Sequence, residues 1–144
     1  MTPVEFHILS ETGDVARLRY ACRLVEQAYE QGQRCYVYAD SNDQAKRMDD
    51  TLWTFRDQAF IPHEILSQDS PSHPRIVAII GNSPVAPTEF QSLLINISES
   101  IPETFGSFTR VCEVVDADPQ HKQLARERYR QYRDKGCQLD TKTL

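Results

Sequence analysis

The sequence predicts an α/β protein whose mostly parallel sheet is sandwiched between helices. Short apolar runs alternate with helical patterns from the start of the chain, and this order is typical of parallel strand pairs. Glycines and prolines stand where these segments end. With 144 residues, 40% of them hydrophobic and 26% charged, the composition suits one soluble domain spanning residues 1–144.

In the first third of the chain, the ranges 4–9 and 34–39 are predicted strands, each followed by a helix. The first helix ends at Gly32, and Ser41 with Gln44 forms a capping-box pattern that opens the second. The apolar stripe of the first helix is Val15, Leu18, Cys22, Val25 and Tyr29. That of the second is Ala45, Met48, Leu52 and Phe55.

The middle of the chain holds six of the eight prolines, between Pro62 and Pro102, and should contain many turns. Further strands are predicted over 60–66, 76–80, 93–97 and 110–116, with a loop and a helical turn over 98–108. The range 76–80 is apolar on both faces and should lie centrally. Pro119 begins a last helix and Gly136 ends it. The last eight residues should form a loose tail that could fold back on the body.

Several classes of protein are disfavoured. The first residues do not resemble a signal peptide and no apolar run could span a bilayer, so we expect a cytoplasmic protein without membrane partners. The four cysteines, with no CxxC pair, read as reduced and mostly buried thiols. Neither GxGxxG nor GxxxxGK[ST] occurs. We therefore expect no catalytic residue, no metal and no cofactor.

Some polar residues keep an alternative open. Asp40 and Asp116 each end a predicted strand, where α/β proteins build their sites. An enzyme that uses a nucleotide is therefore one of the hypotheses that stay open. His7 lies within a strand and should be packed and hydrogen-bonded, whereas His63 and His73 in proline-rich loops should be exposed.

Charge is distributed unevenly along the chain. The net charge is −5, but residues 120–136 carry six basic and two acidic side chains. At about 100° per residue, Lys122, Arg126, Arg130 and Arg133 fall within about 80° of each other on the last helix. Leu124, Ala125 and Tyr132 lie opposite and should face the core, with Tyr129 at the border.

This basic stripe has two interpretations. It could simply keep the helix solvated, or it could bind an acidic protein segment or a nucleic-acid backbone. Because arginine clamps carboxylates with two hydrogen bonds, an acidic peptide ending in an aromatic residue would use the stripe and Tyr129 together. Trp53, the only tryptophan, is either an interface anchor or a cap on the core.

The chain resembles the chi subunit of the bacterial DNA polymerase III clamp-loader complex over essentially its whole length. The similar segments are LARERYRQYRDKG at 124–136, Leu52-Trp53, FIPH at 60–63, EVVD at 113–116 and the opening strand–helix–strand. Residues 67–91 match weakly, and Arg130 stands where lysine is familiar.

The resemblance implies a three-layer Rossmann-like or helicase-like fold without nucleotide binding, in a non-catalytic adaptor of the replisome at the nucleoid. It implies two partners: the psi subunit of the clamp loader, and the acidic C-terminal tail of single-stranded DNA-binding protein (SSB), which ends in Pro-Phe. Nucleic acid is then reached indirectly, through SSB. In some members of the family a helicase-like protein takes the place of psi.

The resemblance also implies the site residues. Lys122, Arg126, Tyr129 and Arg130 correspond to the SSB-tail site, which the stripe extends to Arg133. Trp53 and Phe60 correspond to the psi-facing surface. The alternative is a protein that binds nucleic acid directly through its basic last helix, which the acidic body disfavours.

Overall fold

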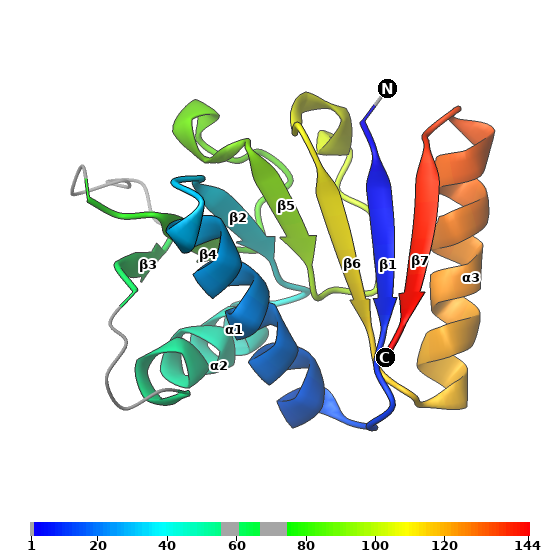
Figure 1. Cartoon of the computed structure of the whole chain (residues 1–144), viewed down its shortest axis with the longest axis horizontal. Helices are drawn as coiled ribbons and strands as arrows, with labels where there is room; N and C mark the ends of the chain where they lie inside the picture. Colours follow the sequence, from blue (N-terminus) through cyan, green and yellow to red (C-terminus); the bar gives the residue numbers. More distant parts are fainter. Residues whose placement is uncertain (1, 56–60, 67–74) are drawn as a thin grey trace.

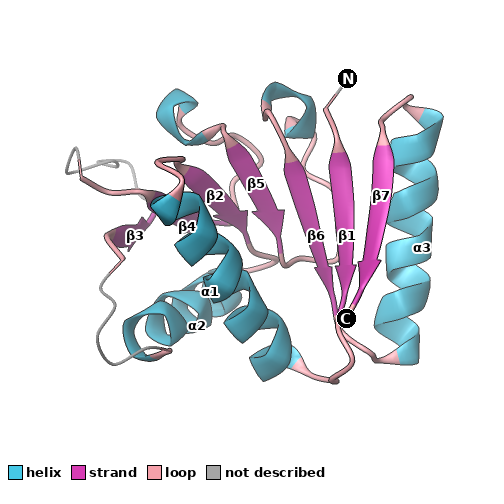
Figure 2. Ribbon diagram, viewed as in Figure 1, coloured by secondary structure: helices cyan, strands magenta, loops and turns pink. Residues whose placement is uncertain are grey.

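A seven-stranded, wholly parallel sheet organises the chain (Figures 1 and 2). The structure is a computed structural model that describes residues 2–55, 61–66 and 75–144. The strands are β1 (Val4–Ile8), β2 (Cys35–Tyr38), β3 (His63–Ile65), β4 (Ala78–Gly81), β5 (Leu93–Asn96), β6 (Val111–Val115) and β7 (Leu139–Thr143). Their order in the sheet is β3-β4-β2-β5-β6-β1-β7.

Helices cover both faces of the sheet, as the sequence predicts. The α-helices are α1 (Asp14–Glu30), α2 (Asn42–Thr54) and α3 (Pro119–Asp134), and the short 3₁₀ turns are η1 (Thr88–Phe90) and η2 (Phe105–Ser107). One core cluster joins α1 and α2 to β2, β4, β5 and β6. A second joins α3 and the 3₁₀ turns to the opposite face. The fold is therefore a three-layer α/β arrangement.

The first two helices follow local rules with one correction. Ser41 Oγ accepts from the Gln44 backbone N–H at 3.1 Å, so the first half of the predicted capping box forms. Gln44 Oε1 accepts from the N–H of Asp40, the residue before the N-cap, at 2.8 Å. The buried stripe of α1 is shorter than predicted, because its two predicted end residues, Val15 and Tyr29, are 72% and 43% exposed. Buried Arg17 instead faces the body, donating to the Ile97 carbonyl and pairing with Asp14.

Two strand predictions need correction. The range 76–80 becomes β4, which is fully buried but second from one edge, because β3 pairs along its outer side. The predicted loose tail is β7, which pairs with β1 in the register Val4 to Leu139. Four of its five side chains are polar and exposed, so the segment carries no apolar signal. The hydrogen bonds to β1 hold it in place instead.

Candidate functional site: a basic groove beside the last helix

A groove of about 520 Å³ runs between α3 and the strands β1, β6 and β7. All five residues predicted for tail binding line it: Lys122, Arg126, Tyr129, Arg130 and Arg133. The remaining lining residues are Phe6, Ile8, Val115, Ala125, Thr141 and Thr143. Residues distant in sequence thus meet because β7 completes the sheet directly under α3 (Figure 1).

The floor of the groove is apolar, and its rim is cationic. Tyr129 lays its ring on Phe6, with the ring centroids 5.4 Å apart and the planes tilted by 55°. Arg133 pairs with the neighbouring Asp134 at 3.5 Å. Among the described residues, Lys122, Arg126 and Arg130 have no such ion pair, so three cationic groups can receive an anionic ligand.

The ends of α3 are fixed by capping residues. Asp118 Oδ1 accepts from the backbone N–H groups of Gln120 at 2.8 Å and His121 at 3.3 Å, which satisfies donors of the first turn. Pro119 occupies the first turn, where a missing N–H costs nothing. Gly136 has φ of 82°, a conformation that favours glycine, and it follows the helix end as predicted.

A buried polar network holds α3 against the sheet. Arg128 Nε donates to Glu113 Oε1 at 3.0 Å, while the Tyr132 hydroxyl and Asn96 Nδ2 donate to Oε2 at 2.7 and 2.8 Å. Glu113 is fully buried and Arg128 is 5% exposed. Burial and the adjacent Glu113 carboxylate raise the pKa of Tyr132. This network fixes the rotation of α3, and with it the direction in which the basic stripe points.

Sequence reasoning missed this network, although a signal for it exists. Ala125 and Tyr132 are buried as predicted, while Leu124 is only half-buried. Arg128 falls near 240° on the helical wheel, in the middle of that core-facing side. A charged residue there requires a buried partner, and Glu113 in the apolar strand β6 is a natural candidate.

The crevice where open α/β sheets bind nucleotides is occupied by the protein's own side chains. Asp116, fully buried after β6, accepts from the Gly13 N–H at the start of α1 at 2.7 Å. Its other oxygen contacts His121 Nδ1 at 2.7 Å. Burial acts to raise the pKa of Asp116, but the Gly13 N–H and His121 outweigh it and hold the pKa below 3.8. A carboxylate therefore sits where a phosphate binds in related folds.

The other residue at the end of a strand, Asp40, is exposed, and its backbone N–H donates to the Gln44 side chain of α2. A smaller hollow of about 310 Å³ lies beside α1. It is lined by Leu9, Ser10, Glu11, Ala16, Arg19, Tyr20, Arg23 and Leu144. No sequence pattern predicted this hollow.

The surface around Trp53 lies at the far end of the sheet from the groove. Trp53 is 55% exposed, and its ring lies against that of His63 with the centroids 5.0 Å apart. The prediction that His63 is exposed is wrong: it is buried, with Nδ1 2.6 Å from the Ile61 carbonyl and Nε2 3.1 Å from Asp49. Phe60 and His73 lie outside the described residues.

His7 and the cysteines agree with their predictions. His7 is buried in β1 and bonds the Tyr20 hydroxyl through Nδ1. Cys22, Cys35 and Cys112 are buried, Cys137 is half-buried, and none is in a disulfide. Within the described ranges, none of the helices is both long and apolar enough to cross a membrane.

Together, the fold and the groove define a class of protein. It is an α/β protein whose own side chains fill the crevice where related folds bind nucleotides, and whose groove has cationic side chains around an apolar floor. A sequence model of the family described as DNA polymerase III chi subunit, HolC, matches residues 1–140. A Pseudomonas aeruginosa protein named DNA polymerase III subunit chi is 37% identical over 139 residues, covering 96% of this chain and 94% of the relative.

Two further relatives carry the same name. The Haemophilus influenzae protein is 31% identical over 142 residues, covering 97% of this chain and 96% of its own. The Escherichia coli protein is 30% identical over 129 residues, covering 85% and 82%. This chain belongs to the DNA polymerase III chi subunit family, whose members are accessory subunits of the replication machinery.

Proposed function

We propose that this chain is a non-catalytic, single-domain adaptor that binds the acidic C-terminal tail of SSB in the α3 groove and the psi subunit through the Trp53 surface. The observation that carries the proposal is the convergence of the five predicted tail-binding residues on one groove. The groove is of a size that suits a small ligand or the end of a peptide. The adaptor would then connect the polymerase to SSB-coated DNA at the replisome.

The chemistry of the groove suits a peptide that ends in an aromatic residue and a free carboxylate. Phe6, Ile8 and Tyr129 offer an apolar surface for the terminal ring. Arg126 lies on the rim beside them, where its guanidinium can clamp the terminal carboxylate with two hydrogen bonds. Lys122 and Arg130 add long-range attraction for the acidic residues that precede it.

A titration with two peptides tests the proposal. A labelled peptide of the host SSB's last residues is followed by fluorescence anisotropy, beside the same peptide without its final phenylalanine. We expect binding that requires the phenylalanine and weakens with salt, because exposed charges are screened. Equal binding of both peptides would show that the apolar floor is not used, and binding of neither would reject the tail site.

The same groove could instead hold phosphates, and a labelled single-stranded oligonucleotide distinguishes that function. Direct binding in the absence of SSB, with a steep loss of affinity on adding salt, would favour a nucleic-acid-binding protein. The apolar floor favours the peptide, because a phosphate backbone gains nothing from the Phe6 and Ile8 side chains.

For psi, the supporting observation is the exposed Trp53 ring, which lies far from the groove. Large apolar side chains that stay exposed on a folded protein often mark an interface. Ile65 of β3, at the same edge of the sheet, is also exposed, at 38%. A helicase-like protein in place of psi would use the same surface. Separate surfaces allow both partners to bind at once.

A further inference from the structure

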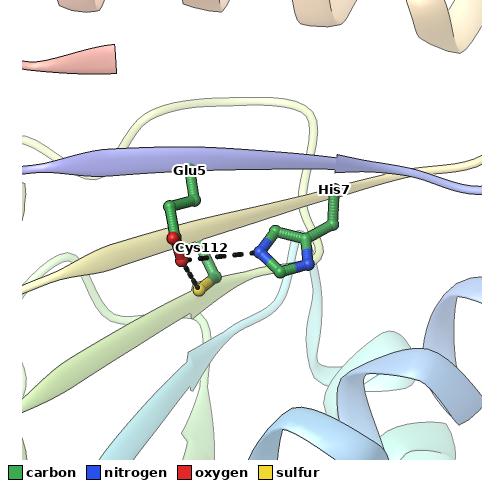
Figure 3. Close-up of side chains that lie close together, drawn as sticks. All are labelled: Glu5, His7 and Cys112. Carbon is green, nitrogen blue, oxygen red and sulfur yellow. Dashed lines mark hydrogen bonds and ion pairs between the residues drawn. The ribbon is translucent and has the colours of Figure 1, made fainter. Parts of the chain in front are cut away.

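Three potential metal-binding side chains meet on the α1-facing side of the sheet (Figure 3). Glu5 and His7 project from one face of β1, and Cys112 lies on β6 directly opposite Glu5 in the strand register. Adjacent parallel strands bring these residues together although Cys112 is distant in sequence. None of them belongs to the groove or to the Trp53 surface.

The spacing of the three donor atoms matches one tetrahedral cation. Glu5 Oε1 lies 3.6 Å from Cys112 Sγ and 3.6 Å from His7 Nε2. All three donor atoms lie within 4.8 Å of one another. Zinc bonds of about 2.0–2.3 Å in tetrahedral geometry require ligand atoms about 3.3–3.8 Å apart. Two of the three distances between these donor atoms already lie in this range.

His7 provides an independent sign that a ligand belongs here. The residue is 4% exposed, and Nε2 faces the other two donors. At 3.6 Å its contact with Glu5 Oε1 is too long for a hydrogen bond, and Nε2 has no hydrogen-bond partner among the described residues. Nδ1 bonds the Tyr20 hydroxyl, which sets the orientation of the ring. In the His7 tautomer whose Nδ1–H donates to the Tyr20 hydroxyl, Nε2 keeps a lone pair for a metal, as in histidine ligands held by an outer hydrogen bond.

We propose that Glu5, His7 and Cys112 bind one divalent cation of the zinc class, with water as the fourth ligand. Carboxylate, imidazole and thiolate are the donors that zinc uses in proteins. The thiolate and the carboxylate together neutralise a divalent charge, whereas nearby Arg110 and Lys142 oppose it electrostatically. Burial raises the pKa of Cys112 to about 12, which opposes binding, because the cation must displace the thiol proton to solvent.

The competing explanation is a purely hydrogen-bonded polar cluster, in which the Cys112 thiol donates to Glu5. Titration of the reduced, metal-free full chain with Co²⁺ separates the two. A cobalt–thiolate pair absorbs in the near ultraviolet, and exposed histidines or carboxylates do not produce that band. We expect the band to saturate at one Co²⁺ per chain and to disappear when Zn²⁺ is added. No thiolate band at any Co²⁺ concentration would overturn the site.

Matched variants locate the site. Cys112→Ala should abolish the band, and Cys22→Ala, which changes another buried cysteine on α1, should leave it unchanged. Glu5→Gln, at a half-exposed position, should preserve the fold and weaken Co²⁺ binding by at least about tenfold. Equal bands in Cys112→Ala and the wild type would place the metal elsewhere and overturn the proposal.

Thermal unfolding with Zn²⁺ gives a second test that does not depend on the cobalt absorption band. Zinc should raise the Tm of the wild type and of Cys22→Ala, because a ligand that binds only the folded state stabilises it. Glu5→Gln should show a smaller rise, and Cys112→Ala none. A Tm rise of equal size in all four proteins would indicate surface binding only and would reject the site.

Discussion

Arg126 and Arg128 stand two residues apart on α3, yet the fold uses them in opposite ways. Arg128 is buried and bonded to the fully buried Glu113, whereas Arg126 lines the groove with no ion pair among the described residues. The difference comes from the helical rotation between them, which turns one arginine to the core and the other to solvent. The same residue type therefore orients the helix at one position and offers a binding group at the other.

The largest expected effect is on stability, from Arg128→Ala. Removing the guanidinium leaves Glu113 as a buried charge that has lost its cation, so the free energy of unfolding should fall by about 3–5 kcal/mol. Arg126→Ala, measured beside it by chemical denaturation, should change that free energy by less than about 0.5 kcal/mol. Similar effects of the two substitutions would contradict the contrast between the two positions.

A double variant sharpens this test. Arg128→Met with Glu113→Gln removes both charges but keeps an acceptor for the Tyr132 and Asn96 donors. It should recover most of the stability lost in Arg128→Ala, because no unpaired charge then remains buried. A double variant as unstable as the single one would show that packing of the arginine, not its charge, is what matters.

The next effect is on binding, from Arg126→Ala. Loss of a charge-assisted, bidentate contact should weaken the SSB-tail peptide by about tenfold or more, which is about 1.4 kcal/mol. Arg23→Ala, at an exposed position beside the other hollow, is the matched control and should bind the peptide normally. Unchanged affinity of Arg126→Ala by calorimetry would remove this residue from the site.

A similar or smaller effect is expected at the opposite end of the sheet. Trp53→Ala should lower the affinity for psi by more than about 1 kcal/mol, while the SSB-tail affinity stays the same. Because Trp53 is more exposed than buried, the fold should survive the change. Full recovery of psi in a pull-down with Trp53→Ala would argue against this surface.

The smallest effect concerns acid stability at the N-terminal end of α3. The pKa of Asp116 is held below 3.8 in the folded state, so the ionised carboxylate stabilises the protein above that pH. This contribution is lost as the pH falls through the folded pKa, where the folded state also takes up the proton. The stability gap between wild type and Asp116→Asn should therefore shrink as the pH falls from about 5 through the folded-state pKa. A constant gap would contradict this.

The sequence predicts the layers and the basic stripe of α3 better than it predicts the edges of the sheet and the polar core. Helical rotation alone places Lys122 and Arg126 on one stripe, because the angle per residue is fixed. By contrast, the sequence does not predict β7, because its residues are mostly exposed and its partner β1 is remote in sequence. The pairing of Glu5 with Cys112 depends on strand register, which no local pattern encodes. The pairing of Arg128 with Glu113 depends on how α3 packs on β6, and the sequence signals only that a charged residue on the core-facing side of the helix needs a buried partner.

The position of β1 between β6 and β7 also bears on how the chain folds. Val4 pairs with Val111 on one side and with Leu139 on the other, so this strand has no neighbour in the sheet until most of the chain has been synthesised. Contacts of such long sequence separation slow folding, because a large loop must close before they form. Until then, both edges of β1 are open to wrong pairing.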